Sequence, residues 1–297
     1  MREAALIGLL LLPKWGVFAD FRSSIEDYLE PQKTVSVQKV IPPVPMGPLR
    51  VGEGAYAGNE KAIYSLDLSS DTSLIENNID DRLQIASLTK LMTAYVALKE
   101  GKALTESVTI PVFVLEPGDA VVGLNTGEQL SYGDLIASML INSGSDAAQS
   151  VATISGGDQT KFVAQMNLAA AGLGLTNTHF ANPVGWDSLE NYSSARDIAN
   201  LTRVLLGNTF FRETVGSKAK VVTTKAGRQI ALTSTNQLLG VNGFAGVKTG
   251  YTYGALECLT SLERVADHEI LTVVLGSGNR FGETTAANTW TKQHFLW

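Results

Sequence analysis

The chain has 297 residues, of which 44% are hydrophobic and 18% are charged, and its formal net charge is −6. The charged fraction lies below the ~25% typical of a soluble domain, which argues against a disordered or charge-driven chain. An acidic chain also lacks the basic face that nucleic-acid binding needs. The single cysteine, Cys258, excludes an intrachain disulfide, and the three histidines have no metal-ligand spacing. The composition therefore predicts neither a metal site nor a nucleic-acid partner.

Residues 1–19 have the organisation of a secretory signal peptide. A short charged start precedes the apolar run Ala4–Leu12, and a V-x-A sequence ends at Ala19. Glu3 and Lys14 depart from that pattern, and a buried first helix is the alternative. The apolar run is too short to span a bilayer, which takes ~20 residues. We therefore expect an exported protein whose leader is either cleaved near Ala19 or retained, and no later segment is apolar enough to cross a membrane.

Proline sets the next segment apart. Five of the nine prolines lie between residues 31 and 48. Each proline fixes φ and removes a backbone donor, so residues 20–50 are predicted to be an extended tether rather than part of a sheet. One continuous domain is expected over residues 51–297.

Within that domain, hydrophobic periodicity predicts strands at both ends and helices between them. Residues 61–68 alternate as a half-buried strand does, and an amphipathic helix begins near Ser87. Further helices are expected from Ser131, which starts a capping-box-like sequence, and after Gly157. Later elements are predicted as strands at 220–224, 229–233, 256–262 and 269–275, and as a final helix at 283–297. This order indicates a sheet whose first strand joins the last ones, with helices covering it.

The first group with catalytic chemistry is Ser87-Leu-Thr-Lys90, at the start of the predicted helix. Side chains at i and i+3 are neighbours on a helix, and the free N–H groups there favour developing negative charge. A serine is a poor nucleophile until a base removes its proton, and Lys90 can do so only as a neutral amine. The spacing alone is weak evidence, because it recurs at Ser36-Val-Gln-Lys39, where no helix aligns the side chains.

Two further polar groups follow in chain order. Ser143-Gly-Ser145 falls in a predicted break between two helices, and Lys248-Thr249-Gly250 precedes a predicted strand. The glycine permits close approach of the backbone to a ligand. Separately, Ser143 has a structural alternative as a helix cap and Lys248 as a strand-edge charge. Together with the first group, they indicate one catalytic cleft.

This combination of motifs resembles the penicillin-recognising serine hydrolases, whose S-x-x-K, S-x-N and K-T-G elements line one cleft. Within that group the chain is most similar to the low-molecular-mass penicillin-binding proteins that are serine-type D-alanyl-D-alanine carboxypeptidases. The resemblance implies a mixed α/β fold of the β-lactamase/transpeptidase type, an antiparallel sheet covered by helices plus a helical subdomain. The resemblance spans roughly residues 50–297 and is carried by residues 86–94, 182–185, 192–199 and 246–252.

The resemblance also implies a catalytic role for three side chains. Ser87 is expected to attack the carbonyl between the two terminal D-alanines of a peptidoglycan stem peptide and form an acyl-enzyme. Lys90 is expected to be the general base, and Ser143 to pass a proton to the leaving amine. β-Lactams are expected to acylate the same serine and inhibit the enzyme. The resemblance implies no cofactor, and with the leader it implies an exported protein of the bacterial periplasm or cell envelope.

Substrate binding is expected from the third motif and part of the second. Lys248 and Thr249 would hold the terminal carboxylate, and Gly250 would let the backbone approach the substrate. The backbone N–H groups of Ser87 and Tyr251 would form an oxyanion hole. Ser145 stands where the family usually has asparagine, and a hydroxyl offers only one donor. Arg280 is a weaker candidate for the carboxylate, with a surface charge as the alternative.

Three other functions remain open at this stage. A D,D-endopeptidase of the same family is favoured by the chain's end about 47 residues after Gly250, whereas Ser-Gly-Ser-Asp-Ala-Ala148 resembles the carboxypeptidase form. A class A β-lactamase would need a glutamate four residues before an asparagine between Ser145 and Lys248, and no such pair occurs. A catalytically weak binder of penicillin or peptidoglycan is the third alternative. Cys258 is expected to be a small buried apolar residue.

Overall fold

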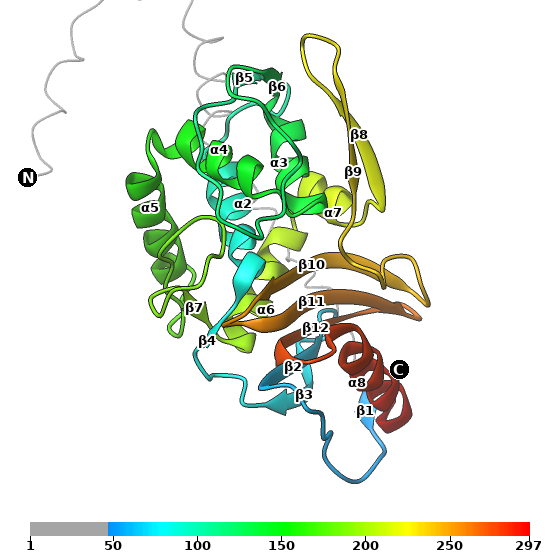
Figure 1. Cartoon of the computed structure of the whole chain (residues 1–297). Coiled ribbons are helices and arrows are strands. Elements are labelled where there is room, and N and C mark those ends of the chain that lie inside the picture. The colour runs from blue at the N-terminus through cyan, green and yellow to red at the C-terminus, as the bar shows by residue number, and fades with distance from the viewer. Residues whose placement is uncertain (1–46) are drawn as a thin grey trace, which may run out of the picture. The chain divides into compact units, whose positions relative to one another are not determined.

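The computed structural model describes residues 47–297, so the predicted leader and nearly all of the tether lie outside the described residues. The centre of the domain is a five-stranded antiparallel sheet with the order β10-β11-β12-β2-β3 (Figure 1). The strands are β2 Ala62–Asp67, β3 Thr72–Asn77, β10 Phe244–Thr252, β11 Leu256–Val265 and β12 His268–Ser277. The first strand lies beside the last ones, so the predicted topology is confirmed.

Strand β2 is buried on both faces, and the prediction of a half-buried strand is wrong. Helix α6, Ala195–Leu206, covers one face of the sheet, and α8, Arg280–His294, covers the other (Figure 1). The alternating polar residues therefore lie beneath α8 instead of facing water. Ser65 Oγ lies 3.0 Å from Thr272 Oγ1, which donates to Asn288 on α8 at 2.8 Å. Because the buried hydroxyls and the amide hydrogen-bond to one another, burying them costs little free energy.

The other helices gather on the α6 side of the sheet (Figure 1). They are α2 Thr89–Lys99, α3 Tyr132–Ile141, α4 Ser145–Gly156, α5 Gln159–Gly172 and α7 Thr209–Val215. The predicted cap of α3 is confirmed, because the Ser131 hydroxyl accepts the N–H of Asp134 at 3.0 Å. Ser87 lies just before α2, in a short 3-10 turn, η1, formed by Ala86–Leu88. Helix α2 is largely buried and packs against α3, α4, α5 and α6.

Short strand pairs lie outside the main sheet, and one of them corrects the predicted boundaries. They are β1 Leu49–Arg50 with β13 Phe295–Leu296, β4 Leu83–Gln84 with β7 Tyr192–Ser193, β5 Ser107–Thr109 with β6 Gln129–Ser131, and β8 Ala219–Thr223 with β9 Gln229–Thr233. The last two tether residues therefore form a strand. The final helix ends at His294 instead of 297, because Phe295 packs against Leu74 and Ile270. The β1–β13 pair joins the two ends of the domain, a long-range contact that local periodicity cannot predict.

We predict that two identical substitutions on neighbouring helices differ sharply in effect. Leu91 on α2 is fully buried, whereas Leu168 on α5 is 73% exposed. Leu91→Ala should lower the free energy of unfolding by about 2–5 kcal/mol, because it leaves a cavity in the core. Leu168→Ala should change it by less than about 0.5 kcal/mol. Urea denaturation followed by circular dichroism measures both, and equal effects would contradict this description of the core.

Candidate active site

Ser87 and Lys90 are in direct contact where η1 meets α2. Lys90 Nζ lies 2.9 Å from Ser87 Oγ and donates to the Val184 carbonyl at 2.8 Å. Lys90 is 1% exposed, and Ser87 is only partly buried. Ala86, directly before the serine, has φ +48°, in the left-handed region that alanine rarely adopts. The backbone therefore holds the hydroxyl within reach of solvent while the amine stays buried.

Burial lowers the pKa of Lys90 to about 7, and the charges of Asp119 and Asp146 oppose that shift. Taking an ammonium out of water disfavours its charged form. A substantial fraction of this amine is therefore neutral near pH 7. In that form it can accept the Ser87 proton and still donate to the Val184 carbonyl.

Two glycines bring backbone against the turn that carries Ser87. Gly185 has φ +101°, and a Cβ there would lie 2.0 Å from the Ala86 carbonyl oxygen. On strand β10, a Cβ on Gly250 would lie 3.1 Å from Ser87 N. The Asn182 side chain shapes the first of these approaches, because its Oδ1 accepts the N–H groups of residues 184, 185 and 186 at 3.1, 2.7 and 3.1 Å. The loop and the strand thus fix η1 between them.

The second and third motifs meet at another buried lysine. Lys248 Nζ donates to Ser143 Oγ at 2.7 Å and to the Thr249 carbonyl at 2.8 Å. Ser143 lies between α3 and α4 with φ +59°. Burial lowers the pKa of Lys248 well below its usual value, and Lys90 and then Arg280 add to the effect. All three motifs therefore lie at one site, and each lysine disfavours a positive charge on the other.

The sequence pattern placed the third motif before a strand, and this prediction is wrong. The motif lies within strand β10. Strand β10 is at the edge of the sheet, yet Lys248 is 1% exposed and Thr249 4%, so the strand-edge alternative for Lys248 is wrong. Thr249 Oγ1 lies 2.6 Å from Thr235 Oγ1, and Tyr251 is 55% exposed. Thr249 and Tyr251 thus come from one stretch of backbone that passes Ser87.

Arg280, the first residue of α8, is partly buried, so its surface-charge alternative is also wrong. Its Nη1 donates to the Gly250 carbonyl at 2.8 Å, and its backbone N–H donates to Glu257 Oε2 at 2.9 Å. In this arrangement the guanidinium supports the backbone of β10 beside the lysines.

Ser145 is engaged with a residue that sequence reasoning missed. Its hydroxyl donates to Asp119 Oδ1 at 2.8 Å, and Trp186 Nε1 donates to the same oxygen at 2.9 Å. Asp119, Trp186 and Thr235 lie in none of the three sequence motifs. Tertiary contacts, rather than local sequence, bring them to the site. An aspartate after Gly118 is common in turns and gives no specific signal.

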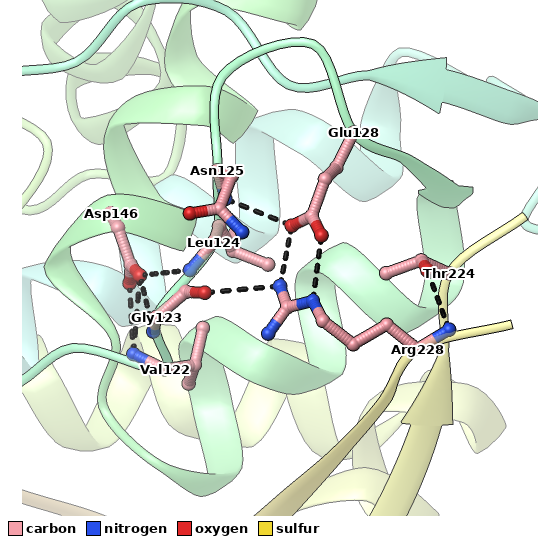
Figure 2. Close-up of polar contacts among 8 residues, drawn as sticks. All are labelled: Val122, Gly123, Leu124, Asn125, Glu128, Asp146, Thr224 and Arg228. Atoms are coloured by element: carbon pink, nitrogen blue, oxygen red, sulfur yellow. Dashed lines mark hydrogen bonds and ion pairs between the residues drawn. The ribbon is translucent and has the colours of Figure 1, made fainter. Parts of the chain in front are cut away.

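The loop before α3 is fixed to the site wall at two points (Figure 2). The buried carboxylate of Asp146 accepts the N–H groups of Val122, Gly123 and Leu124 at 2.9–3.2 Å. Farther along the loop, Arg228 from the β8–β9 turn pairs with Glu128 and donates to the Gly123 carbonyl at 3.0 Å. The loop beside Ser143 and Ser145 is therefore ordered by the buried carboxylate of Asp146 and by a solvent-exposed ion pair of Arg228.

Metal chemistry and cysteine chemistry find no support in residues 47–297. That part of the chain has no cluster of three His, Cys, Asp or Glu side chains placed to hold a metal ion. Cys258 is fully buried in β11, and burial raises the pKa of its thiol to about 11. The prediction that Cys258 is a buried packing residue is confirmed.

Comparisons with known proteins agree with this geometry. The family model for D-alanyl-D-alanine carboxypeptidases matches residues 57–279. The chain is 36% identical over 245 residues to the D-alanyl-D-alanine carboxypeptidase DacC of Escherichia coli, covering 77% of this chain and 60% of that protein. It is 32% identical over 231 residues to the D-alanyl-D-alanine carboxypeptidase of Streptomyces sp. strain K15, covering 72% and 79%.

Among solved structures, that of the Streptomyces K15 DD-transpeptidase matches with a TM-score of 0.76 at 28% identity, covering 81% of this chain and all of that one. The chain therefore belongs to the D-alanyl-D-alanine carboxypeptidase family, and the predicted family and fold class are confirmed. It spans 58% to 60% of the length of the curated Bacillus subtilis and Escherichia coli relatives DacF, DacC and DacA.

The contact at Gly185 generates a prediction about the serine. Gly185→Ala should destabilise the fold by about 2 kcal/mol or more and abolish acylation of Ser87, because the new Cβ meets the Ala86 backbone and the φ angle is unfavourable. Gly172→Ala at the end of α5 is the matched control, since a Cβ there meets nothing within 4 Å. It should be neutral or stabilising by up to about 1 kcal/mol. Thermal unfolding and β-lactam labelling of both variants check this, and normal labelling of Gly185→Ala would refute it.

Proposed function

We propose that this chain is a serine D-alanyl-D-alanine carboxypeptidase that removes the terminal D-alanine from peptidoglycan stem peptides. The observation that carries the proposal is the 2.9 Å contact between a buried amine whose pKa is about 7 and the accessible hydroxyl of Ser87. The named relatives support the same activity for this site.

Acylation begins with one proton transfer. Neutral Lys90 takes the hydroxyl proton of Ser87, and Oγ forms a bond to the carbonyl carbon of the penultimate D-alanine. The resulting oxyanion receives the N–H groups of Ser87 and Tyr251, a contact worth a few kcal/mol of barrier. Ser143 then passes its hydroxyl proton to the amine as the carbon–nitrogen bond breaks and regains a proton from protonated Lys90, so that Lys90 is neutral again and free D-alanine leaves. Water hydrolyses the ester and regenerates Ser87.

Residues of strand β10 bind the terminal carboxylate of the substrate in this proposal. Lys248 and Thr249 present an amine and a hydroxyl, and Gly250 leaves room for the substrate backbone. Lys248 also donates to Ser143, so binding of the carboxylate and delivery of the proton share one hydrogen-bond network. Ser145 is the remaining polar group that we assign to substrate binding.

We further propose that the protein acts outside the cytoplasm, in the bacterial cell envelope. The sequence of residues 1–19 and the bacterial origin of the relatives support this location. Among residues 47–297, no helix combines the length and apolar character needed to span a bilayer.

A fluorescent penicillin tests the nucleophile directly. The full chain should be labelled covalently, and Ser87→Ala should remove the labelling, because no other hydroxyl contacts the Lys90 amine in the part of the chain described. Ser36→Ala is the matched control, since it alters the second Ser-x-x-Lys sequence, and it should leave labelling unchanged. Persistent labelling of Ser87→Ala would exclude this nucleophile.

Release of D-alanine then separates the candidate activities. A pentapeptide ending in D-Ala-D-Ala should yield free D-alanine, detected by D-amino acid oxidase. Cleavage of cross-linked muropeptides alone would instead assign a D,D-endopeptidase, and labelling without turnover would assign a penicillin binder.

The pH dependence of acylation should report Lys90. A base must be neutral to act, so the rate should fall as pH decreases through about 7, where Lys90 becomes protonated, and should level off above it. Stopped-flow measurement of β-lactam acylation between pH 5 and pH 9 checks this. A rate independent of pH across that range would contradict the role given to Lys90.

A further inference from the structure

A single carboxylate connects two walls of the cleft. Asp119 Oδ1 accepts the Ser145 hydroxyl from the start of α4 and the Trp186 indole N–H from the loop opposite. That loop also carries Val184, whose carbonyl accepts a hydrogen bond from Lys90, and Gly185, which packs against the turn that contains Ser87. Asp119 thus ties the second motif to the segment that holds the catalytic pair.

We propose that Asp119 is a positioning residue for the peptidase reaction, because it turns the Ser145 hydroxyl hydrogen away from the substrate and leaves that oxygen as an acceptor for a peptide N–H. This inference rests on the proposed function and extends it to substrate recognition. A carboxylate without a proton can only accept, so the hydrogen of Ser145 must point toward Asp119. No other hydrogen bond to Ser145 Oγ occurs within residues 47–297. The serine therefore presents lone pairs only, whereas an asparagine would present a donor as well.

The loop that carries Asp119 is held firmly enough for this role. The second oxygen of Asp119 accepts the N–H of Glu116 at 2.8 Å, and the backbone N–H of Ser145 donates to Ala120 at 2.7 Å. Three residues later, the loop passes over the buried carboxylate of Asp146, as Figure 2 shows. Both ends of the Asp119–Ser145 hydrogen bond are therefore fixed by the backbone.

The charge of Asp119 provides a second, independent readout. The groups that face Lys90 are Asp119 from the loop, Asp146 from α4 and Lys248 from β10, besides the Ser87 hydroxyl and the Val184 carbonyl. The two carboxylates raise the pKa of Lys90 and thus offset part of the effect of its burial. Removing the negative charge of Asp119 favours the neutral amine, which moves the fall in acylation rate to lower pH.

Asp119→Asn preserves the shape of the side chain and removes its charge. The measurement is β-lactam acylation from pH 5 to pH 9, together with kcat and KM for D-alanine release from a pentapeptide. In the plot of acylation rate against pH, we call the fall on the acidic side the acid limb. We expect the midpoint of the acid limb of Asp119→Asn to lie at a pH lower by roughly half a unit or more than that of the wild type. We also expect KM to rise by roughly five- to tenfold, which corresponds to the loss of one hydrogen bond, because the single acceptor oxygen of asparagine cannot serve both the Ser145 hydroxyl and the Glu116 N–H as the two oxygens of Asp119 do.

Two matched variants separate the charge from the hydroxyl. Ser145→Ala should raise KM similarly and leave the acid limb in place, because the Asp119 charge remains. Adding Ser145→Ala to Asp119→Asn should raise KM by less than about twofold more, since both changes disrupt the same contact. Trp186→Phe removes one donor to Asp119 and retains its charge, so it should leave the acid limb in place.

The outcomes are distinct. If Asp119→Asn is folded by circular dichroism and keeps the wild-type acid limb and KM, the inference is overturned while the proposed function stands. If Ser145→Ala leaves KM unchanged, the acceptor role of Ser145 is wrong. If the wild-type chain neither reacts with the penicillin nor releases D-alanine, the proposed function fails, and this inference fails with it.

Discussion

The site depends on keeping the amine of Lys90 out of water. An ammonium buried without a full counter-charge is unfavourable, and proteins relieve that cost by releasing the proton. Lys90 is 1% exposed, and its pKa is lowered to about 7. Lys248 is equally buried, and the neighbouring Lys90 lowers its pKa further. The same burial that would destabilise a charged lysine thus leaves a neutral amine within hydrogen-bond distance of Ser87 near pH 7, which is what the proposed base requires.

The rest of the fold serves this arrangement by bringing distant segments against one short turn. Strand β10 passes Ser87 at Gly250, and the loop ordered by Asn182 closes on it at Gly185. Helix α2, buried among four other helices, carries Lys90 on its first turn. The sheet matters here because its edge strand carries Lys248 toward Ser143. A small displacement of any of these elements changes the Ser87–Lys90 contact on which the proposed reaction relies.

Sequence patterns predicted the features that are local, and tertiary contacts decided the others. The order of element types predicted the first strand beside the last ones, and a four-residue signature predicted the Ser131 cap; the structure confirms both. Strand β3 and the position of Lys248 within β10 were not predicted. The roles of the motif residues remain proposals, although the structure brings all three motifs to one site. Asp119 could not be found, because its partners lie 26 and 67 residues away in sequence. Likewise, the ending of α8 depends on Phe295, which packs on the far side of the sheet from α6.

The most direct test is the pKa of Lys90 itself. Protein containing lysine labelled with ¹³C at Cε can be titrated by NMR, and the Lys90 resonance is identified by its absence in Lys90→Ala. We predict a midpoint near pH 7, well below the ~10.4 of a free lysine side chain. A Lys90 resonance that shows the ammonium form up to pH 9 would contradict the central claim, because that amine could not accept the proton of Ser87.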